Sequence, residues 1–393
     1  MKKGWEVKKL GEIADVQSGG TPLVSNRAFW NGNLPWYSSG ELNDVYTSAP
    51  ERHISALGLE NSNAKLFPKG SLLIGMYDTA ALKMSILDRT GAFNQAIAGV
   101  RPNEQIDLVF VLHAIDAIRE SVLGQRRGVR QKNLSLGKIR EIELSIPPLP
   151  EQQRIVGILD KAFAGLAVAV ANAEKNLQNA RALFESHLQS VFTQRGEGWK
   201  ERTLEEIATT FGRGKSKHRP RNEPALYGGK YPFIQTGDIR NADHVITEYS
   251  QTYSDVGLAQ SKLWPKGTIC ITIAANIAET AILGFDACFP DSVIGVVVNP
   301  KEAEVGFIEY LLQSFKSRIQ ALGKGSAQAN INMGTFENER FPFPPVSEQN
   351  QIVEKLDSLS AETQRLAAIY ERKLAVLLEL KKSLLHQAFR GEL

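Results

Sequence analysis

The chain carries the segment Pro147-Pro148-Leu149-Pro150-Glu151-Gln152, which recurs 197 residues later as Pro344-Pro345-Val346-Ser347-Glu348-Gln349. The same offset relates Gln131-Lys132-Asn133-Leu134 to Gln328-Ala329-Asn330-Ile331. Nearer the start the offset is 194, and Trp5 there corresponds to Trp199. A period near 200 is too long for a solenoid and indicates two copies of one globular unit with its connector. Two similar modules suit a target with two similar halves, of which duplex DNA is one.

A long helix follows each Pro-Pro pair. No proline interrupts the chain between Glu151 and Phe192, and apolar or small residues recur there at steps of three and four, which is the pattern of a coiled-coil seam. The first stripe comprises Ile155, Leu159, Ala162, Leu166, Ala169, Ala173, Leu177, Ala180, Phe184, Leu188 and Val191. The second, each residue 197 later, comprises Ile352, Leu356, Leu359, Thr363, Leu366, Tyr370, Leu374, Leu377, Lys381, Leu385 and Ala388, where Thr363 and Lys381 weaken the pattern.

Both helices are expected to begin at the same point of the repeat. Pro150 suits a first helical position and Ser347 suits an N-cap. Each helix spans about 42 residues, which gives a rod about 63 Å long. We expect the two helices to pack on each other as an antiparallel coiled coil, with the modules at opposite ends. The alternative is that each helix lies on its own module.

The modules are predicted to be α+β domains. Expected strands are Ser71–Met76, Ala96–Val100, Thr268–Thr272 and Val293–Val298, and expected helices are Asp107–Leu123 and Glu304–Leu322. The pattern leaves strand pairing open. The expected domains are residues 1–150 and 196–346 for the two modules, with spacer helices at 151–195 and 347–393.

Composition is that of an ordinary soluble protein, with 42% hydrophobic and 23% charged residues among 393. Two cysteines argue against a disulfide framework and fit a reducing compartment. No secretory signal follows the N-terminal lysines, and the most apolar stretch, Ala162–Ala173, is expected to be too short for a membrane span. These observations predict a cytoplasmic protein with no membrane partner. A formal net charge of +3 neither demands nor excludes nucleic acid.

Catalytic patterns are weak. Gly214-Lys215-Ser216 resembles the end of a phosphate-binding loop, but Thr209 stands where that loop needs its first glycine. The six histidines show no metal-ligand spacing, and Cys270 and Cys288 are expected to pack as small hydrophobes. We therefore expect no catalytic residue, no metal and no cofactor. An enzyme with unrecognised motifs stays open as an alternative.

Two basic clusters are the positive signals for nucleic-acid binding. One has five cations in nine residues, and the other has four in seven: Arg213, Lys215, Lys217, Arg219 and Arg221, then Arg126, Arg127, Arg130 and Lys132. Glycines interrupt both, which favours loops over helix faces. Such loops can neutralise phosphates, and arginine is the side chain that most often recognises guanine. The alternative is a solvated surface loop.

The clusters are not equivalent in the repeat. Residues 126–132 align with 323–329, where Lys324 is the one charged residue. Gln328 corresponds to Gln131. Residues 213–221 align with the neutral Gly19-Gly20-Thr21-Pro22 stretch. Modules with a common frame and unlike loops can recognise two different half-sequences. Further candidate contacts are Gly20, Thr21, Lys324, Gln328 and two polar loop residues at matching places, Ser39 and Thr236, although their loops equally suit turn formation.

These motifs together resemble the DNA specificity subunit of type I restriction-modification systems, over nearly the whole chain. The marks of the resemblance are Leu10-Gly11-Glu12-Ile13, Gly19-Gly20-Thr21-Pro22, Trp30-Asn31-Gly32, Phe67-Pro68-Lys69-Gly70, the Pro-Pro-Leu-Pro-Glu-Gln helix entry in both copies, and the ending Gln387-Ala388-Phe389-Arg390-Gly391-Glu392-Leu393. The second module departs from the pattern, because the basic run replaces the Gly-Gly-Thr-Pro turn.

The resemblance implies a subunit without catalytic activity. In that family each module recognises one part of a split site in double-stranded DNA, and the paired helices fix the gap. The subunit recruits two modification subunits, which bind S-adenosylmethionine and methylate adenine, and ATP-driven restriction subunits. Two other classes stay open: a duplicated scaffold that binds only proteins, and a self-contained DNA methyltransferase or nuclease.

Overall fold

The computed structural model describes residues 4–124, 133–194, 196–217, 220–274, 277–323, 331, 333–337 and 339–393. It divides into two compact units. Unit 1 comprises Met1–Glu174 and Arg372–Leu393, and unit 2 comprises Lys175–Glu371. Each unit contains one module and a segment of each long helix.

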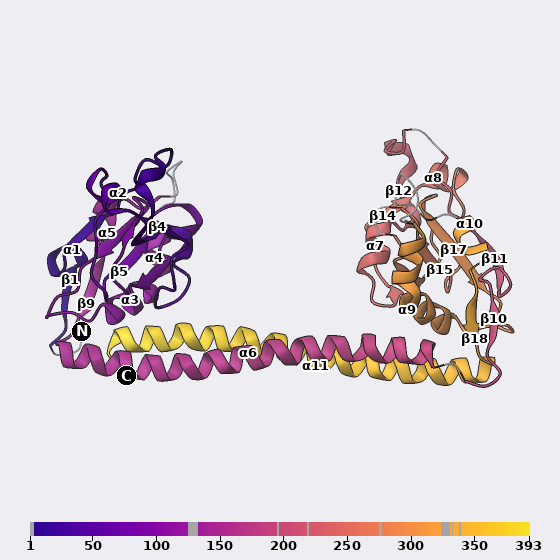
Figure 1. Ribbon diagram of the computed structural model, residues 1–393. Helices are drawn as coiled ribbons and strands as arrows, with labels where there is room; N and C mark the ends of the chain where they lie inside the picture. The colour runs from indigo at the N-terminus through magenta and orange to yellow at the C-terminus, as the bar shows by residue number, and fades with distance from the viewer. Residues whose placement is uncertain are drawn as a thin grey trace. The chain divides into compact units, whose positions relative to one another are not determined.

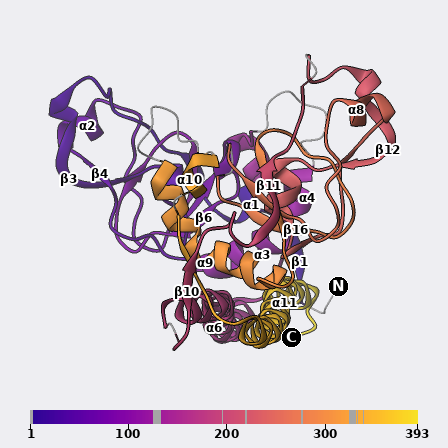
Figure 2. The ribbon, with the colours of Figure 1, turned by 90° about the vertical axis from the view of Figure 1, so that its right-hand side faces the viewer.

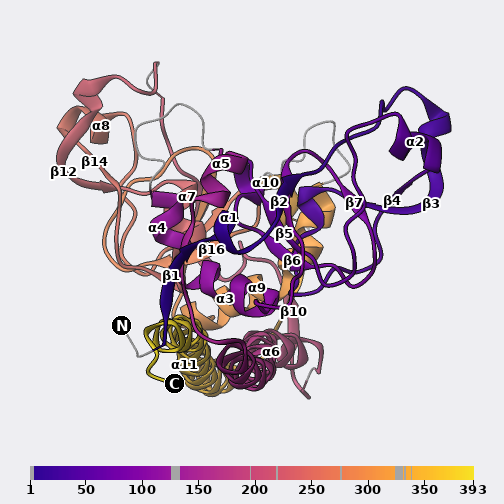
Figure 3. The same cartoon turned by 90° about the vertical axis from the view of Figure 1, so that its left-hand side faces the viewer.

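The module of unit 1 is built on a four-stranded antiparallel sheet in the order β2-β8-β5-β6. These strands are β2 (Val16–Ser18), β8 (Ile97–Val100), β5 (Leu72–Gly75) and β6 (Met84–Ile86). A smaller sheet has the order β4-β3-β7, and β1 pairs with β9; the bounds are β4 (Arg52–Ile54), β3 (Trp30–Tyr37), β7 (Ala92–Phe93), β1 (Glu6–Lys9) and β9 (Glu143–Ile146). The helices are α1 (Leu10–Ile13), α2 (Ala56–Glu60), α3 (Leu108–Ala117), α4 (Arg119–Gly124) and α5 (Leu136–Arg140). Figure 3 faces this unit and shows α3 between the strands and the long-helix segments.

Unit 2 repeats this topology. Its main sheet has the order β11-β17-β15-β16-β13, in which β13 is an addition to the pattern of unit 1. The strands are β11 (Ala208–Arg213), β17 (Val293–Val298), β15 (Ile269–Thr272), β16 (Thr280–Leu283) and β13 (Val245–Ile246), with the pairs β12 (Tyr227–Phe233)–β14 (Gln251–Tyr253) and β10 (Lys200–Arg202)–β18 (Phe341–Phe343). The module helices are α7 (Thr236–Asn241), α8 (Asp255–Ala259), α9 (Val305–Gly323) and α10 (Met333–Glu337). Figure 2 faces unit 2 and shows α9 next to the long helices, with β12 and α8 in a separate lobe.

The strands expected from the sequence are present at β5, β8, β15 and β17, within two residues at each end. The expected helix over Asp107–Leu123 is interrupted instead. The N–H of Ile118 bonds to the carbonyl of Ile115, three residues back, so α3 ends there and α4 begins at Arg119. The expected helix over Glu304–Leu322 is confirmed as α9.

The long helices are α6 (Leu149–Thr193) and α11 (Val346–Arg390), each of 45 residues (Figure 1). Both start at the same point of the repeat, as expected, but earlier than expected. Pro150 is the second residue of α6, and Ser347 lies inside α11 instead of capping it. The reason is that Glu151 N–H already bonds to Pro148 O, and Glu348 N–H to Pro345 O, both at 2.9 Å.

The two apolar stripes form the seam. Every stripe residue of α6 is buried or half-buried, and so is every stripe residue of α11 except Lys381. The ammonium of Lys381 lies 5.3 Å from the ring centre of Phe163. The hydroxyl of Thr363 donates to the carbonyls of Leu359 and Ser360, so this polar residue can be buried in the seam.

Within each unit the two helix segments run antiparallel. In unit 1 the beginning of α6 meets the end of α11: Ile155 and Leu385 share a core, and Arg154 donates to Leu393 O over 2.7 Å. In unit 2 the order is reversed, because Leu188 near the end of α6 shares a core with Leu356 near the start of α11. These cores also include the module strands, so the helices pack on the modules as well as on each other.

The apolar part of α6 extends beyond the stretch that the sequence analysis considered. Among the described helices α6 alone has the length and composition of a membrane span, with a mean hydropathy of 1.6 over 18 residues. The stretch Ala162–Ala173 that the sequence singled out lies within this longer helix. Only 17% of the 18-residue stretch is buried within the described structure.

Candidate nucleic-acid interface

A crossing of two loops at one end of the unit 2 sheet gathers several of the predicted contact residues. Residues 214–217, which follow β11, run beside the turn at residues 289–292, which leads into β17. The N–H of Gly214 bonds to Val293 O over 2.9 Å. A Cβ on Gly214 would lie 2.3 Å from the carbonyl oxygen of Phe289, so only glycine fits this close approach.

The unit 2 crossing, meaning residues 213–216 and 221 with 289–293, carries an ion pair. The Nη2 of Arg221 lies 2.8 Å from Oδ1 and 3.0 Å from Oδ2 of Asp291, and both side chains are partly exposed. The Nε of Arg213 donates to the backbone carbonyl of Asp291 over 2.7 Å. Two arginines of the predicted basic run are thus held on one residue, which the sequence did not single out.

Two lysines lie on segments that adjoin near this crossing. The charge of Lys215, together with burial as the larger cause, lowers the pKa of the Lys262 ammonium. That ammonium lies 3.6 Å from the ring centre of Trp264. The Ser261 hydroxyl donates to Lys215 O over 2.8 Å, which fixes the two segments together.

Two hollows flank Arg221. One, of about 350 Å³, is lined by Arg213, Arg221, Asp291 and Ser292 among others. The other, of about 220 Å³, is lined by Ser216, Arg221, Gln235, Thr236 and Ser292 among others. The predicted contact Thr236 therefore lies beside the same arginine. Lys215 and Lys217 are exposed, whereas their neighbours Gly214 and Ser216 are buried.

Unit 1 has the same crossing with different side chains. The N–H of Gly19 bonds to Ile97 O over 3.2 Å, as Gly214 bonds to Val293 in unit 2, and the N–H of Gly20 bonds to Phe93 O over 2.9 Å. The hydroxyl of Thr21 donates to Oε1 of Gln95 over 2.5 Å. The unit 1 crossing, meaning residues 19–21 with 93–97, is thus neutral where that of unit 2 is charged.

Gly20 itself is buried. Its carbonyl accepts a 3.0 Å hydrogen bond from the indole N–H of Trp36, and a Cβ there would lie 2.3 Å from the backbone of Asn63. This geometry makes Gly20 a backbone support for its neighbour Thr21. Trp36 and its counterpart Phe233 are both buried in the module cores.

The polar loops at Ser39 and Thr236 form the same local structure in both units. Ser38 N–H bonds to the Glu41 carboxylate over 2.6 Å, and Gln235 N–H bonds to the Asp238 carboxylate over 2.8 Å. Both are capping boxes at the start of a short helix. Ser39 and Thr236 are half-buried first residues of those helices.

Seven predicted contact residues lie outside the described part of the chain: Arg126, Arg127, Arg130, Lys132, Arg219, Lys324 and Gln328. The structure in turn adds Gln95, Asp291 and Lys262, which sequence reasoning missed. Gln95 and Asp291 occupy matching places in the repeat, just before β8 and β17. The strand registers give this correspondence, whereas the sequence offset of 197 aligns Gln95 with Ser292.

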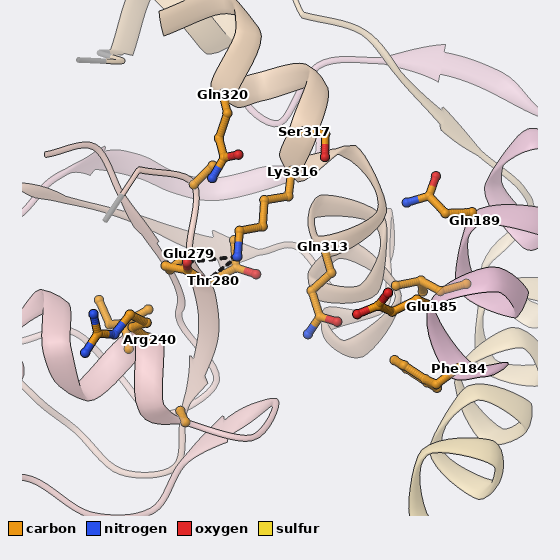
Figure 4. Close-up of a pocket in the computed structure, with 14 residues that line it drawn as sticks. Phe184, Glu185, Gln189, Arg240, Glu279, Thr280, Gln313, Lys316, Ser317 and Gln320 are labelled. Atoms are coloured by element: carbon orange, nitrogen blue, oxygen red, sulfur yellow. Dashed lines mark hydrogen bonds and ion pairs between the residues drawn. The ribbon is translucent and has the colours of Figure 1, made fainter. Parts of the chain in front are cut away.

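Other polar features lie away from the crossings. In unit 2 a pocket of about 570 Å³ lies between α6, α7 and α9, and there Lys316 Nζ forms a 2.8 Å ion pair with Glu279 (Figure 4). Burial raises the pKa of the Cys270 and Cys288 thiols, which disfavours the reactive thiolate.

The described residues contain no group of three or more His, Cys, Asp or Glu side chains that could hold a metal ion.

A buried polar cluster also joins β13, α9 and α11 in unit 2. The imidazole Nδ1 of His244 contacts the carboxylate of Glu309, which is fully buried, and the ring stacks on Tyr310. The Tyr310 hydroxyl donates to Asp357 over 2.7 Å. Burial lowers the pKa of His244, but the hydrogen bond and charge of Glu309 outweigh burial, so the net effect raises it.

The chain is similar to known proteins over its whole length. It matches the family model described as "Type I restriction modification DNA specificity domain" twice, over residues 2–176 and 196–371. The type I restriction enzyme MjaIX specificity subunit of Methanocaldococcus jannaschii is 21% identical, with 100% of this chain and 94% of that protein covered. The EcoR124I/EcoR124II specificity subunit of Escherichia coli is 30% identical over 40% of each chain.

Two solved structures have the same fold. One, titled as the structural basis of complex assembly and conformational transition of the type I R-M system, matches with a TM-score of 0.81 and 18% identity, covering 100% of this chain and 99% of that one. The HsdS subunit of Thermoanaerobacter tengcongensis matches with a TM-score of 0.65 and 18% identity, covering 100% and 98%.

Proposed function

The chain belongs to the type I restriction modification DNA specificity family, and from this premise we propose that it is the DNA-recognition subunit of a type I restriction-modification complex. Each module, residues 1–150 and 196–346, recognises one half of a bipartite site in double-stranded DNA. The spacer helices, residues 151–195 and 347–393, set the gap between the half-sites.

One observation carries this proposal. The same backbone crossing occurs in both units, but it presents neutral Thr21 and Gln95 in one and charged Arg213, Arg221 and Asp291 in the other. A repeated frame with unlike polar side chains is suited to two unlike half-sequences. Of the predicted contacts, Thr21, Arg213, Lys215, Lys217, Arg221 and Thr236 lie at or beside these crossings. Ser39 and the predicted contacts outside the described part of the chain are proposed as DNA contacts from the sequence alone.

The helices also supply docking surface. Large apolar side chains on the faces away from the seam are exposed, among them Val168, Leu183, Ile369, Val376 and Leu378. These exposed apolar side chains are available for contact with a protein partner. The partners proposed from the family are two modification subunits, which supply S-adenosylmethionine-dependent methylation, and ATP-dependent restriction subunits. The subunit itself is proposed to be non-catalytic, without a cofactor of its own, and to act in the cytoplasm.

The proposal is tested with the chain assembled with its modification subunits and a library of randomised duplexes. The bound DNA is expected to be enriched in two short sequences separated by a fixed gap. A protein-binding scaffold would enrich no sequence. Methyl transfer by the purified chain alone would support a self-contained enzyme and contradict the proposal.

A further inference from the structure

The surroundings of the unit 2 crossing contain cations of two kinds, an arginine paired with a carboxylate and lysines that form no ion pair with another described residue. At the unit 2 crossing the charge of Arg221 is offset by Asp291, 2.8 Å away. Lys215 and Lys262, by contrast, are like charges on two segments that the hydrogen bond from the Ser261 hydroxyl to Lys215 O joins. A phosphate relieves the repulsion between two lysines but gains less from an arginine whose charge is already compensated.

An arginine whose charge is offset by a carboxylate, and whose orientation that carboxylate fixes, is suited to recognise a base. The carboxylate of Asp291 contacts a single guanidinium nitrogen, Nη2, and thereby fixes the direction of the planar group. Arg221 also lines both flanking hollows, so its surroundings are open to a ligand. A guanidinium with a fixed plane can donate two hydrogen bonds to O6 and N7 of guanine.

In the unit 1 crossing a hydrogen bond orients the side-chain amide of Gln95 in a similar way. Gln95 is exposed, and the hydroxyl of Thr21 donates to its Oε1. This bond sets which end of the amide is oxygen and which is nitrogen. Among the described residues Nε2 has no hydrogen-bond partner, and Oε1 keeps a second lone pair. An amide in this state can donate to N7 of adenine and accept from its N6 amino group.

We infer that Gln95 and Arg221 are the base-recognising side chains of the two modules, specifying adenine in one half-site and guanine in the other. Thr21 and Asp291 are the positioning residues that orient them. Gln95 corresponds to Asp291 in the repeat, so the two modules use different positions of the same crossing to contact a base. This inference rests on the proposed function and adds residue-level specificity to it.

The test repeats the randomised-duplex selection with the assembled complex and four variants. Gln95→Arg is expected to replace a preferred adenine by guanine at one position of one half-site. Arg221→Gln is expected to remove a guanine preference at one position of the other half-site, and Asp291→Asn to weaken that same preference. The change in preference should be roughly 5- to 150-fold, as for one bidentate base contact. Gln95→Ala, which introduces no new donor, should abolish the preference at the Gln95 position.

Two matched controls lie at the opposite end of the same modules. Gln105 is an exposed residue after the end of β8, whereas Gln95 lies before its start. Arg340 is the exposed residue directly before β18. Gln105→Arg and Arg340→Gln should both select the same DNA motif as the parental complex. In each variant the unaltered half-site is an internal check that the protein is folded. A parental motif retained by Gln95→Arg, Gln95→Ala and Arg221→Gln would overturn the inference while leaving the function intact. If the parental complex enriches no bipartite motif, the proposed function fails and the inference fails with it.

Discussion

The backbone N–H of Asp107 donates a 2.8 Å hydrogen bond to Oε1 of Gln152, a side chain that is wholly buried in the first turn of α6. The Nε2 of Gln152 donates in turn to Pro147 O over 2.8 Å. In unit 2 the N–H of Glu304 bonds to Gln349 in the same way, also at 2.8 Å. One glutamine in each copy therefore connects the start of a module helix to the start of a spacer helix.

Replacing this glutamine should destabilise its unit. Gln152→Ala leaves the Asp107 N–H and the Pro147 carbonyl without partners in a buried site, and we expect a loss of about 2–4 kcal/mol in the free energy of unfolding. Urea unfolding of the full chain measures the loss. The control Gln153→Ala, at the exposed next position, should stay within about 0.5 kcal/mol of the parent. Equal stabilities for the two variants would contradict the account of the junction.

The glycine at the unit 2 crossing should not tolerate a methyl group. Gly214→Ala places a Cβ 2.3 Å from Phe289 O and 2.4 Å from Pro290 O, both backbone atoms. We expect a cost of about 1–3 kcal/mol and weaker DNA binding, because the crossing must open. Gly237→Ala, where nothing lies within 4 Å of the new Cβ, should be neutral or slightly stabilising, since it sits in helix α7. Thermal unfolding and a duplex-binding titration measure both effects.

Stability of unit 2 should depend on pH through His244. Its folded pKa is raised by Glu309, with smaller contributions from Asp357 on α11 and Glu304. A raised pKa contributes stability that is fully present below the unfolded value, near 6.5, and is lost as pH rises through the folded pKa. Unfolding free energy measured from pH 6 upward should therefore fall. His244 has a φ of 65°, which asparagine tolerates, so His244→Asn should flatten this dependence; an unchanged slope would rule out His244 as its source.

Phosphate contacts should be visible in the salt dependence of DNA binding. Lys215→Gln or Lys262→Gln should weaken binding to all duplexes similarly and reduce the slope of log affinity against log salt by about one. Lys301→Gln is the matched control, because Lys301 is an exposed lysine beyond the other end of β17. Fluorescence titrations at several salt concentrations distinguish these results. An unaltered slope in both test variants would exclude the two lysines as phosphate contacts.

The long helices could be predicted from the sequence because their signal is local. Steps of three and four residues require only neighbours in the chain, and the buried seam from Ile155 to Val191 follows that pattern throughout. The helix starts were less predictable, since they depend on hydrogen bonds to Pro148 and Pro345 that extend each helix before its expected cap.

The candidate site was predictable only in part. Charge and glycine content identified Arg221 as a loop residue, but the same expectation was wrong for Arg213, which is the last residue of β11 and pairs with Ile294. Gln95 and Asp291 carry no local signal, because their role depends on the pairing of β2 with β8 and of β11 with β17, strands that are far apart in sequence. Lys262 likewise joins the site through a tertiary contact, because the hydroxyl of its neighbour Ser261 donates to Lys215 O. Such non-local contacts are where a single sequence without relatives is least informative.

Lengthening both spacer helices tests the central claim most directly. Four residues inserted after Glu174 in α6 and after Glu371 in α11 add one turn to each helix, about 6 Å, or roughly two base pairs of DNA. Randomised-duplex selection with the assembled complex is expected to return both parental half-sequences with a longer gap between them. The parental gap, recovered unchanged from the lengthened protein, would contradict the claim that the helix pair sets the spacing of two separate recognition modules.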